Sequence, residues 1–200
     1  MKKLQLNLSM LALVLTGLIS NRAAAQKSSD IIMDVGSVTV NIGVGVGNTY
    51  SGSYGSGYSG YYGGTGFGGK VAIERGFWQL GPGVLTLGLE AGGSFSNGNL
   101  GYGYSTGYKS SIAVFAARSA YHYGWNVPNL DTYAGVAVGA GLRSYDAYDI
   151  NNDKYKEHKT VAVVGGFIGA SYFFSSNIGV NVEVGNDITY AQGGVIFKLK

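Results

Sequence analysis

The sequence predicts an all-β fold, an eight-stranded antiparallel transmembrane β-barrel that follows a cleaved signal peptide. Three observations support this fold class: apolar residues alternate with small or polar ones, the alternating segments number eight, and long and short connections follow one another between them. Successive side chains of a strand point to opposite faces, so a period of two describes a ribbon whose faces meet different surroundings.

The first part of the chain has the pattern of a secretory signal peptide. A positive start at Lys2 and Lys3 precedes an apolar run at 4–18, and three alanines at 23–25 supply a cleavage site. The run is shorter than the ~20 residues of a spanning helix. We therefore expect a signal peptide at 1–25, a periplasmic N-terminal leader at 26–36 and the outer-membrane barrel at 37–200.

Composition narrows the function classes. The signal holds three of the 14 basic residues, so the mature chain has 11 Lys and Arg against 11 Asp and Glu. This balance, without a basic cluster, gives no support to nucleic-acid binding, which needs a basic face. The sequence has no cysteine, which excludes a disulfide scaffold and a thiolate metal site.

The first three predicted strands alternate clearly. In 37–47 every second residue is Val or Ile, and the other face carries Ser, Thr, Asn and Gly. The segment 70–78 alternates in the same way, although Arg75 interrupts its apolar face. In 85–95 the apolar face is formed mainly by leucines, opposite small and polar residues and one glutamate.

The remaining five strands are less uniform. The segment 109–123 carries apolar residues on both faces, and we place Ala113 and Phe115 outward because this sends Arg118 and His122 inward. The segment 160–174 is apolar on both faces, so its facing is not predicted. The other three alternate more clearly: 131–143, 178–185 and 188–200.

The connections separate the two ends of the predicted barrel. Long connections at 50–69, 97–108 and 144–159 fall at one end, whereas the other end has short links that aromatic residues flank. Only the last link at the long-loop end, 185–187, is short. This layout is typical of outer-membrane barrels, whose short turns face the periplasm and whose aromatic belts mark the membrane interface.

Charged residues fall on the face opposite to the aliphatic residues. Buried charges are costly unless they are paired, so this face cannot form a hydrophobic core. Four cations and three carboxylates can instead pair across a narrow lumen, with the Val, Ile and Leu residues facing lipid. The predicted polar network of the lumen comprises Lys70, Glu74, Glu90, Arg118, Arg143, Glu183 and Lys198.

Three segments resemble a known family. GGFIGASYFFSSNIGVNVEVGN (165–186) and GGVIFKLK (193–200) resemble the closing strands of small porin-like outer-membrane β-barrel proteins common in Bacteroidetes, and LDTYAGVAVGAG (130–141) is similar to the same family. The resemblance implies a Gram-negative outer-membrane barrel, inserted by the barrel assembly machinery, and transfers no catalytic residue. Such barrels usually end in an aromatic residue, so Phe197 or Leu199 must take that place here.

We predict no catalytic, cofactor-binding or metal site. The glycine pattern at 55–60 lies in a repetitive loop with no helix after it, which argues against a nucleotide site. Residues 149–153 have the spacing of a calcium loop, but Lys154 and Thr160 stand where Gly and Glu are required. The two histidines are expected at opposite ends of the barrel, so they cannot share a zinc ion.

The predicted function is that of an integral outer-membrane protein with a structural or surface-interaction role, in contact with membrane lipid and lipopolysaccharide. Its candidate surface for an extracellular ligand is the tyrosine-rich loop, whose tyrosines combine contact area with hydrogen-bonding tips. Two alternatives remain open: a narrow porin-like channel, because inward glycines leave room, and a lipid-modifying enzyme using His158 with Asp153 and a loop serine. The loop tyrosines are Tyr50, Tyr54, Tyr58, Tyr61 and Tyr62.

Overall fold

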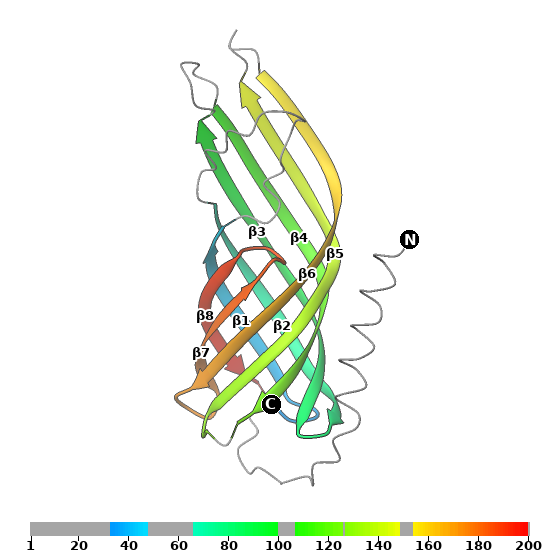
Figure 1. The fold of residues 1–200 in the computed structure, drawn as a ribbon, viewed down its shortest axis with the longest axis vertical. Helices are drawn as coiled ribbons and strands as arrows, with labels where there is room; N and C mark the ends of the chain where they lie inside the picture. Colours follow the sequence, from blue (N-terminus) through cyan, green and yellow to red (C-terminus); the bar gives the residue numbers. More distant parts are fainter. Residues whose placement is uncertain (1–32, 48–65, 100–106, 126, 149–153, 200) are drawn as a thin grey trace, which may run out of the picture.

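The computed structural model describes residues 33–47, 66–99, 107–125, 127–148 and 154–199. Within these residues, eight antiparallel strands form one closed ring, in which each strand pairs with its neighbours in the chain and the last pairs with the first (Figure 1). The predicted fold class is therefore confirmed, while the predicted signal peptide lies outside the described residues. The strands are β1 (Val38–Val46), β2 (Phe67–Leu80), β3 (Gly83–Asn99), β4 (Gly107–Gly124), β5 (Leu130–Tyr148), β6 (Lys154–Phe173), β7 (Ile178–Gly185) and β8 (Ala191–Lys198).

Side chains alternate between the outer surface and the interior along every strand, as the period of two predicts. In β4, Arg118 and His122 point inward, in agreement with the facing inferred from sequence. The structure also assigns the facing of β6, which the sequence left open. Phe167 is buried in the interior, and Ile168 is exposed on the outer surface.

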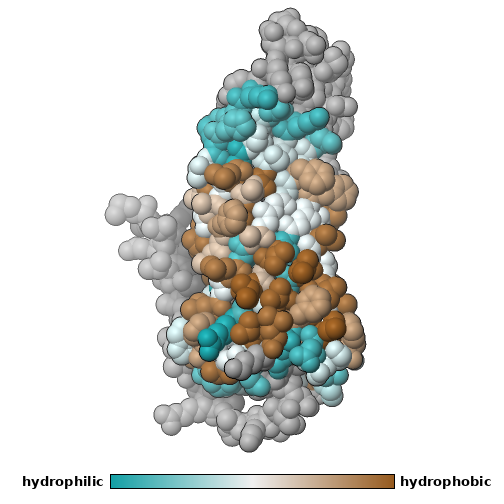
Figure 2. All heavy atoms as spheres, turned by 180° about the vertical axis from the view of Figure 1, so that it is seen from behind, coloured by the Kyte–Doolittle hydropathy of each residue, from teal (hydrophilic) through white to brown (hydrophobic). Residues whose placement is uncertain are grey.

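The outer surface carries a continuous apolar band. Val44 is 74% exposed and Leu89 is 64% exposed, and hydrophobic residues cover the middle of the molecule in Figure 2. Hydrophilic residues gather at the end where the longest strands finish. A water-soluble protein rarely exposes an apolar area of this extent, whereas a barrel that faces lipid requires one. No helix suitable for crossing a membrane occurs in the described part of the chain.

The strands extend further at this end than the sequence predicts. The expected loop at 144–159 is wrong, because β5 and β6 pair through Tyr148 and Lys154 and leave only 149–153 outside the described residues. Likewise, β3 reaches Asn99 and β4 begins at Gly107. Both faces of these extensions carry polar residues, so the hydropathy alternation fades although backbone pairing continues.

Unequal strand lengths make the ring asymmetric. β1, β7 and β8 have eight or nine residues each, whereas β3 to β6 have 17 to 20 and project beyond them (Figure 1). β6 pairs with β7 only from Phe167 to Phe173. The longest strands therefore form a four-stranded sheet at one side of the barrel mouth.

The aromatic residues expected at the short-turn end are mostly outward. A register shift between Gly76 and Trp78 inserts one extra residue, so Phe77 and Trp78 are both exposed next to the β2–β3 turn. Phe173 departs from the expected belt, because its ring is buried in the barrel.

Candidate functional site

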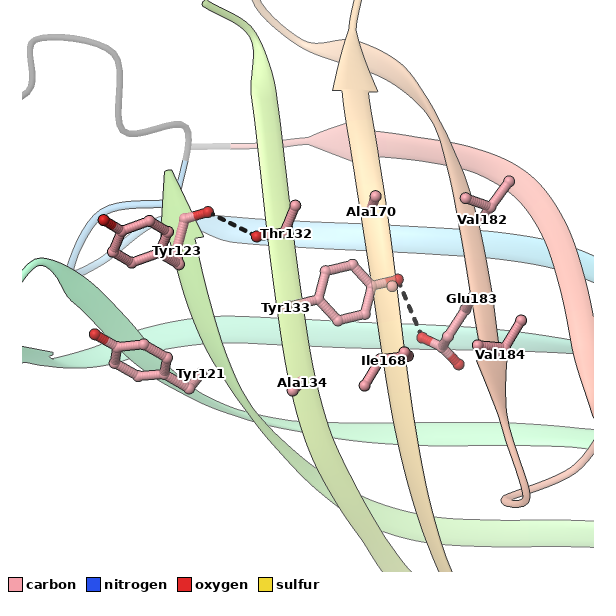
Figure 3. A pocket seen from close by; sticks show the side chains of 11 residues that line it. Tyr121, Tyr123, Thr132, Tyr133, Ala134, Ile168, Ala170, Val182, Glu183 and Val184 are labelled. Carbon is pink, nitrogen blue, oxygen red and sulfur yellow. Dashed lines mark hydrogen bonds between the residues drawn. The ribbon is translucent and has the colours of Figure 1, made fainter. Parts of the chain in front are cut away.

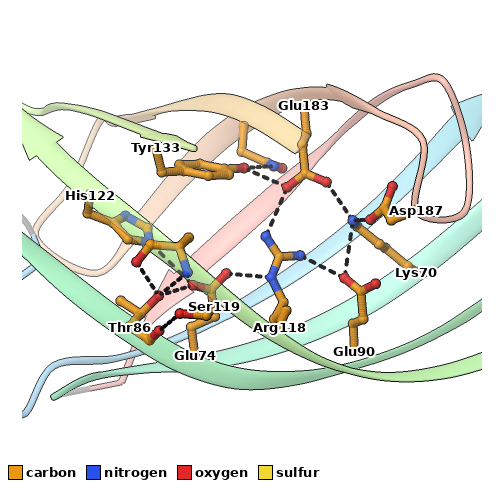
Figure 4. Close-up of polar contacts among 12 residues, drawn as sticks. Lys70, Glu74, Thr86, Glu90, Arg118, Ser119, His122, Tyr133, Glu183 and Asp187 are labelled. Atoms are coloured by element: carbon orange, nitrogen blue, oxygen red, sulfur yellow. Dashed lines mark hydrogen bonds and ion pairs between the residues drawn. The ribbon is translucent and has the colours of Figure 1, made fainter. Parts of the chain in front are cut away.

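The lumen of the barrel holds a connected network of charged side chains (Figure 4). Five of the seven charged residues predicted to face inward meet here: Lys70, Glu74, Glu90, Arg118 and Glu183. They come from β2, β3, β4 and β7, so contacts cross the lumen as well as run along its wall. The closed ring thus brings together residues far apart in the sequence.

Arg118 lies at the centre of this network. Its Nε lies 2.8 Å from Oε1 of Glu74, Nη1 donates to Oε2 of Glu90 at 3.0 Å, and Nη2 donates to Oε2 of Glu183 at 3.1 Å. The rigid, planar fork of a guanidinium suits such multiple binding. The guanidinium also lies over the Phe167 ring, 4.0 Å from its centroid, so β6 supports it from a further side.

Lys70 shares two of these carboxylates. Its Nζ donates to Oε1 of Glu183 at 2.5 Å and to Oε2 of Glu90 at 3.4 Å, and it also pairs with Asp187. Glu90 and Glu183 therefore each bridge the two cations. Every one of these side chains is almost completely removed from solvent, so each charge depends on its partners for stabilisation.

His122 extends the network toward the short-turn end. Nδ1 lies 2.8 Å from Oδ2 of Asp131, and Nε2 lies 3.3 Å from Oε2 of Glu74. The imidazole stacks on Tyr133 at 5.0 Å, and the Tyr133 hydroxyl donates to Glu183 at 3.1 Å. A continuous chain of polar contacts therefore runs from Asp131 to Asp187.

The charge composition of the network differs from the predicted one. Arg143 and Lys198 occupy inward, half-buried positions, but Arg143 pairs in register with Lys159 near the long-strand end and Lys198 pairs with Thr39 on β1. Asp131 and Asp187 join instead. In the contacts described above, five carboxylates meet Lys70, Arg118 and His122, while Arg143 and Lys198 have contacts of their own at their inward positions.

The connection between β7 and β8 folds into the barrel. Asp187, Ile188 and Thr189 are each at most 3% exposed, and Asp187 pairs with Lys70. Ile188 packs into an apolar cluster with Val114, Val163 and other interior residues. The predicted start of the last strand at 188 is therefore wrong, because this segment turns inward as a plug. Apolar residues such as Val114, Val163 and Ile188 therefore share the interior with the charged network.

Glycines in the wall make room for this plug. A Cβ atom on Gly165 would lie 2.6 Å from Cα of Asp187, and one on Gly92 would lie 2.9 Å from Cδ1 of Ile188. A Cβ on Gly68 would lie 2.8 Å from Cγ2 of Thr189. The sequence predicts that inward glycines leave room for a channel, but at Gly92 the side chain of Ile188 occupies this room.

A second segment lies against the interior at the short-turn end. The Gly36 amide donates to the Gly76 carbonyl at 2.8 Å, and the Gly76 amide donates to the Ser37 carbonyl at 3.0 Å. A Cβ on Gly76 would lie 2.2 Å from the carbonyl oxygen of Asp34, and Met33 is fully buried. The Asp34 carbonyl and the Met33 side chain therefore lie against the interior near the short turns, whereas Val35 is exposed.

The other candidate residues are not brought together. All five loop tyrosines and Asp153 lie outside the described residues. His158 is exposed and pairs in register with Ser144 near the long-strand end, whereas His122 is buried beside Asp131. Among the described residues, no group of three or more His, Asp or Glu is arranged to hold a metal ion.

Comparison with known proteins gives similarity of fold only. No family model matches the sequence, and no curated protein matches it. A designed transmembrane β-barrel superposes with a TM-score of 0.49 at 15% identity, covering 84% of this chain and 98% of its own. Ail, the attachment invasion locus protein of Yersinia pestis, crystallised with sucrose octasulfate, superposes with a TM-score of 0.40 at 10% identity, covering 82% of this chain and 96% of its own. Neisserial surface protein A superposes with a TM-score of 0.43 at 14% identity, with the same coverage of the two chains. The resemblance to Bacteroidetes barrels stays a prediction.

Replacing Lys70 by Met should lower the free energy of unfolding in lipid bilayers by about 3–5 kcal/mol, because it leaves buried carboxylates without their cation. Lys156→Met, at an exposed lysine of β6, should cause a smaller loss. Urea titration of the folded barrel in vesicles measures both. Equal losses would show that the network does not stabilise the interior.

Adding a methyl group at Gly165 should destabilise the barrel by about 1–3 kcal/mol, because the new Cβ overlaps the backbone of Asp187. Gly166→Ala is the matched control: its Cβ would point outward and meet nothing closer than 3.8 Å, so its effect should stay within about 0.5 kcal/mol. The same titration compares them. A Gly165→Ala protein as stable as the control would contradict the seated plug.

Proposed function

We propose that this protein is an outer-membrane β-barrel with a closed lumen, which anchors its long-strand end at the cell surface in a structural or surface-interaction role. The observation that carries this proposal is the filling of the lumen by the charged network and by a chain segment at each end. Eight strands enclose an interior that side chains just fill, so a closed barrel is also the geometry expected for this size.

The orientation follows from the two ends of the barrel. Outer-membrane barrels have short turns on the periplasmic side and longer extensions outside, which places β3 to β6 outward from the cell. Lys109 and Lys156 are exposed on the polar extensions, beyond the apolar band. Their charge suits the anionic headgroups of lipopolysaccharide, which we propose as a lipid partner. The tyrosine-rich segment between β1 and β2, 50–69, remains the proposed site for an extracellular ligand.

A non-enzymatic role fits the described residues better than a lipid-modifying one. The two ring nitrogens of His122 each contact a carboxylate, that of Asp131 or that of Glu74, so this histidine has no nitrogen left to activate a serine. His158 is exposed on β6 and belongs to the polar extension. We further propose that the chain depends on the barrel assembly machinery for insertion.

Single cysteines test the orientation, because the natural sequence has none. Lys156→Cys, at the long-strand end, should react with a membrane-impermeant maleimide on intact cells. Ser176→Cys, in the exposed β6–β7 turn, should react only after the outer membrane is permeabilised. Labelling of both on intact cells, or of neither, would contradict the proposed display.

Planar-bilayer recording tests the closed lumen against the channel alternative. Purified wild-type protein should give no stable single-channel steps, because the network and the plug leave no continuous aqueous path. Reconstitution is checked in parallel by the resistance of the barrel to protease in the same lipid. Reproducible steps that Arg118→Gln alters would favour a porin-like channel and overturn the proposal.

A further inference from the structure

A groove crosses the outer surface of the barrel from β4 to β7, in the half nearer the short turns (Figure 3). Its volume is about 490 Å³. Small residues, Ala134 on β5 and Ala170 on β6, form its floor. The larger side chains of Tyr121 and Val182 stand on either side of them.

Cross-strand register explains this hollow. Thr132 on β5 lies beside Ala170 on β6, and Ala170 in turn lies beside Val182 on β7. Gly169 thins the wall, because a Cβ there would lie 2.4 Å from Cζ of Tyr133 on the inner side. Tyr133 and Glu183 also line the groove, and the Tyr133 hydroxyl donates to the Glu183 carboxylate at 3.1 Å, so these two polar groups satisfy each other.

One end of the groove lies beside an aromatic pair near the short turns. Tyr123 packs edge-on against Trp125 at 4.8 Å, and Trp125 Nε1 donates to Oγ1 of Thr132 at 2.7 Å. Such aromatic residues mark the interface with the headgroups. From there the groove runs across the strands, around the barrel wall, over three strand spacings or roughly 14 Å.

We propose that this groove binds an acyl chain of a glycerophospholipid in the periplasmic leaflet. The groove is continuous with the lipid-facing band, its lining on the outer side is apolar, and it begins at the headgroup level where Trp125 and Tyr123 lie. A second copy of this chain is a poorer fit. The convex outer wall of its barrel would contact Tyr121 and Val182 before it reached the floor of the groove. This inference rests on the membrane placement under the proposed function.

Quenching of Trp125 by a phospholipid with brominated acyl chains tests this site. The chain has two tryptophans, so all variants carry Trp78→Phe, which leaves Trp125 as the only tryptophan. In vesicles, quenching of Trp125 in the Trp78→Phe parent should saturate at a mole fraction of brominated phospholipid several-fold below that expected for random lipid contact. Ala170→Leu fills the groove and should return quenching to the random dependence.

The matched control is Ala162→Leu, the same substitution at an exposed alanine of β6 outside the groove, which should behave as the parent. Random quenching in the parent, or no change on Ala170→Leu, would overturn the proposal. A parent dimer that Ala170→Leu dissociates would assign the groove to a second copy and overturn it as well. If no variant is quenched at any lipid fraction, the chain does not insert, and the proposed function fails with it.

Discussion

The contact of Arg118 with three carboxylates is the interaction on which the interior depends. Lipid outside the barrel takes the aliphatic face of each strand, so the polar face must turn inward and its charges must find partners there. Glu74, Glu90 and Glu183 reach the guanidinium from separate strands. This one cation therefore ties together walls that the chain connects only through the ring of hydrogen-bonded strands.

The plug continues the same electrostatic arrangement. Lys70 contacts Glu90 and Glu183, which already bind Arg118, and also contacts Asp187 in the β7–β8 connection. The connection is thus held by charge at Asp187 and by apolar packing at Ile188. Two kinds of interaction, charge pairing and apolar packing, therefore hold this connection inside the barrel.

Sequence reasoning predicted which face of each strand points inward, because the alternation of apolar and polar residues can be read within a single strand. It placed Arg118 and Glu90 inside for this reason. It could not choose the partners, because alternation assigns each side chain to a face but not to a height along the barrel axis. Asp187 was missed because it follows a strand in a segment that reads as a turn. The length of β5 was missed because a polar strand outside lipid loses its hydropathy signal.

The inward β7–β8 connection is a poor place to modify the chain. A peptide inserted at 186–190 would compete with Lys70 and with the wall glycines for a fixed volume. An epitope tag placed there would therefore displace the packed interior instead of extending the protein into solvent.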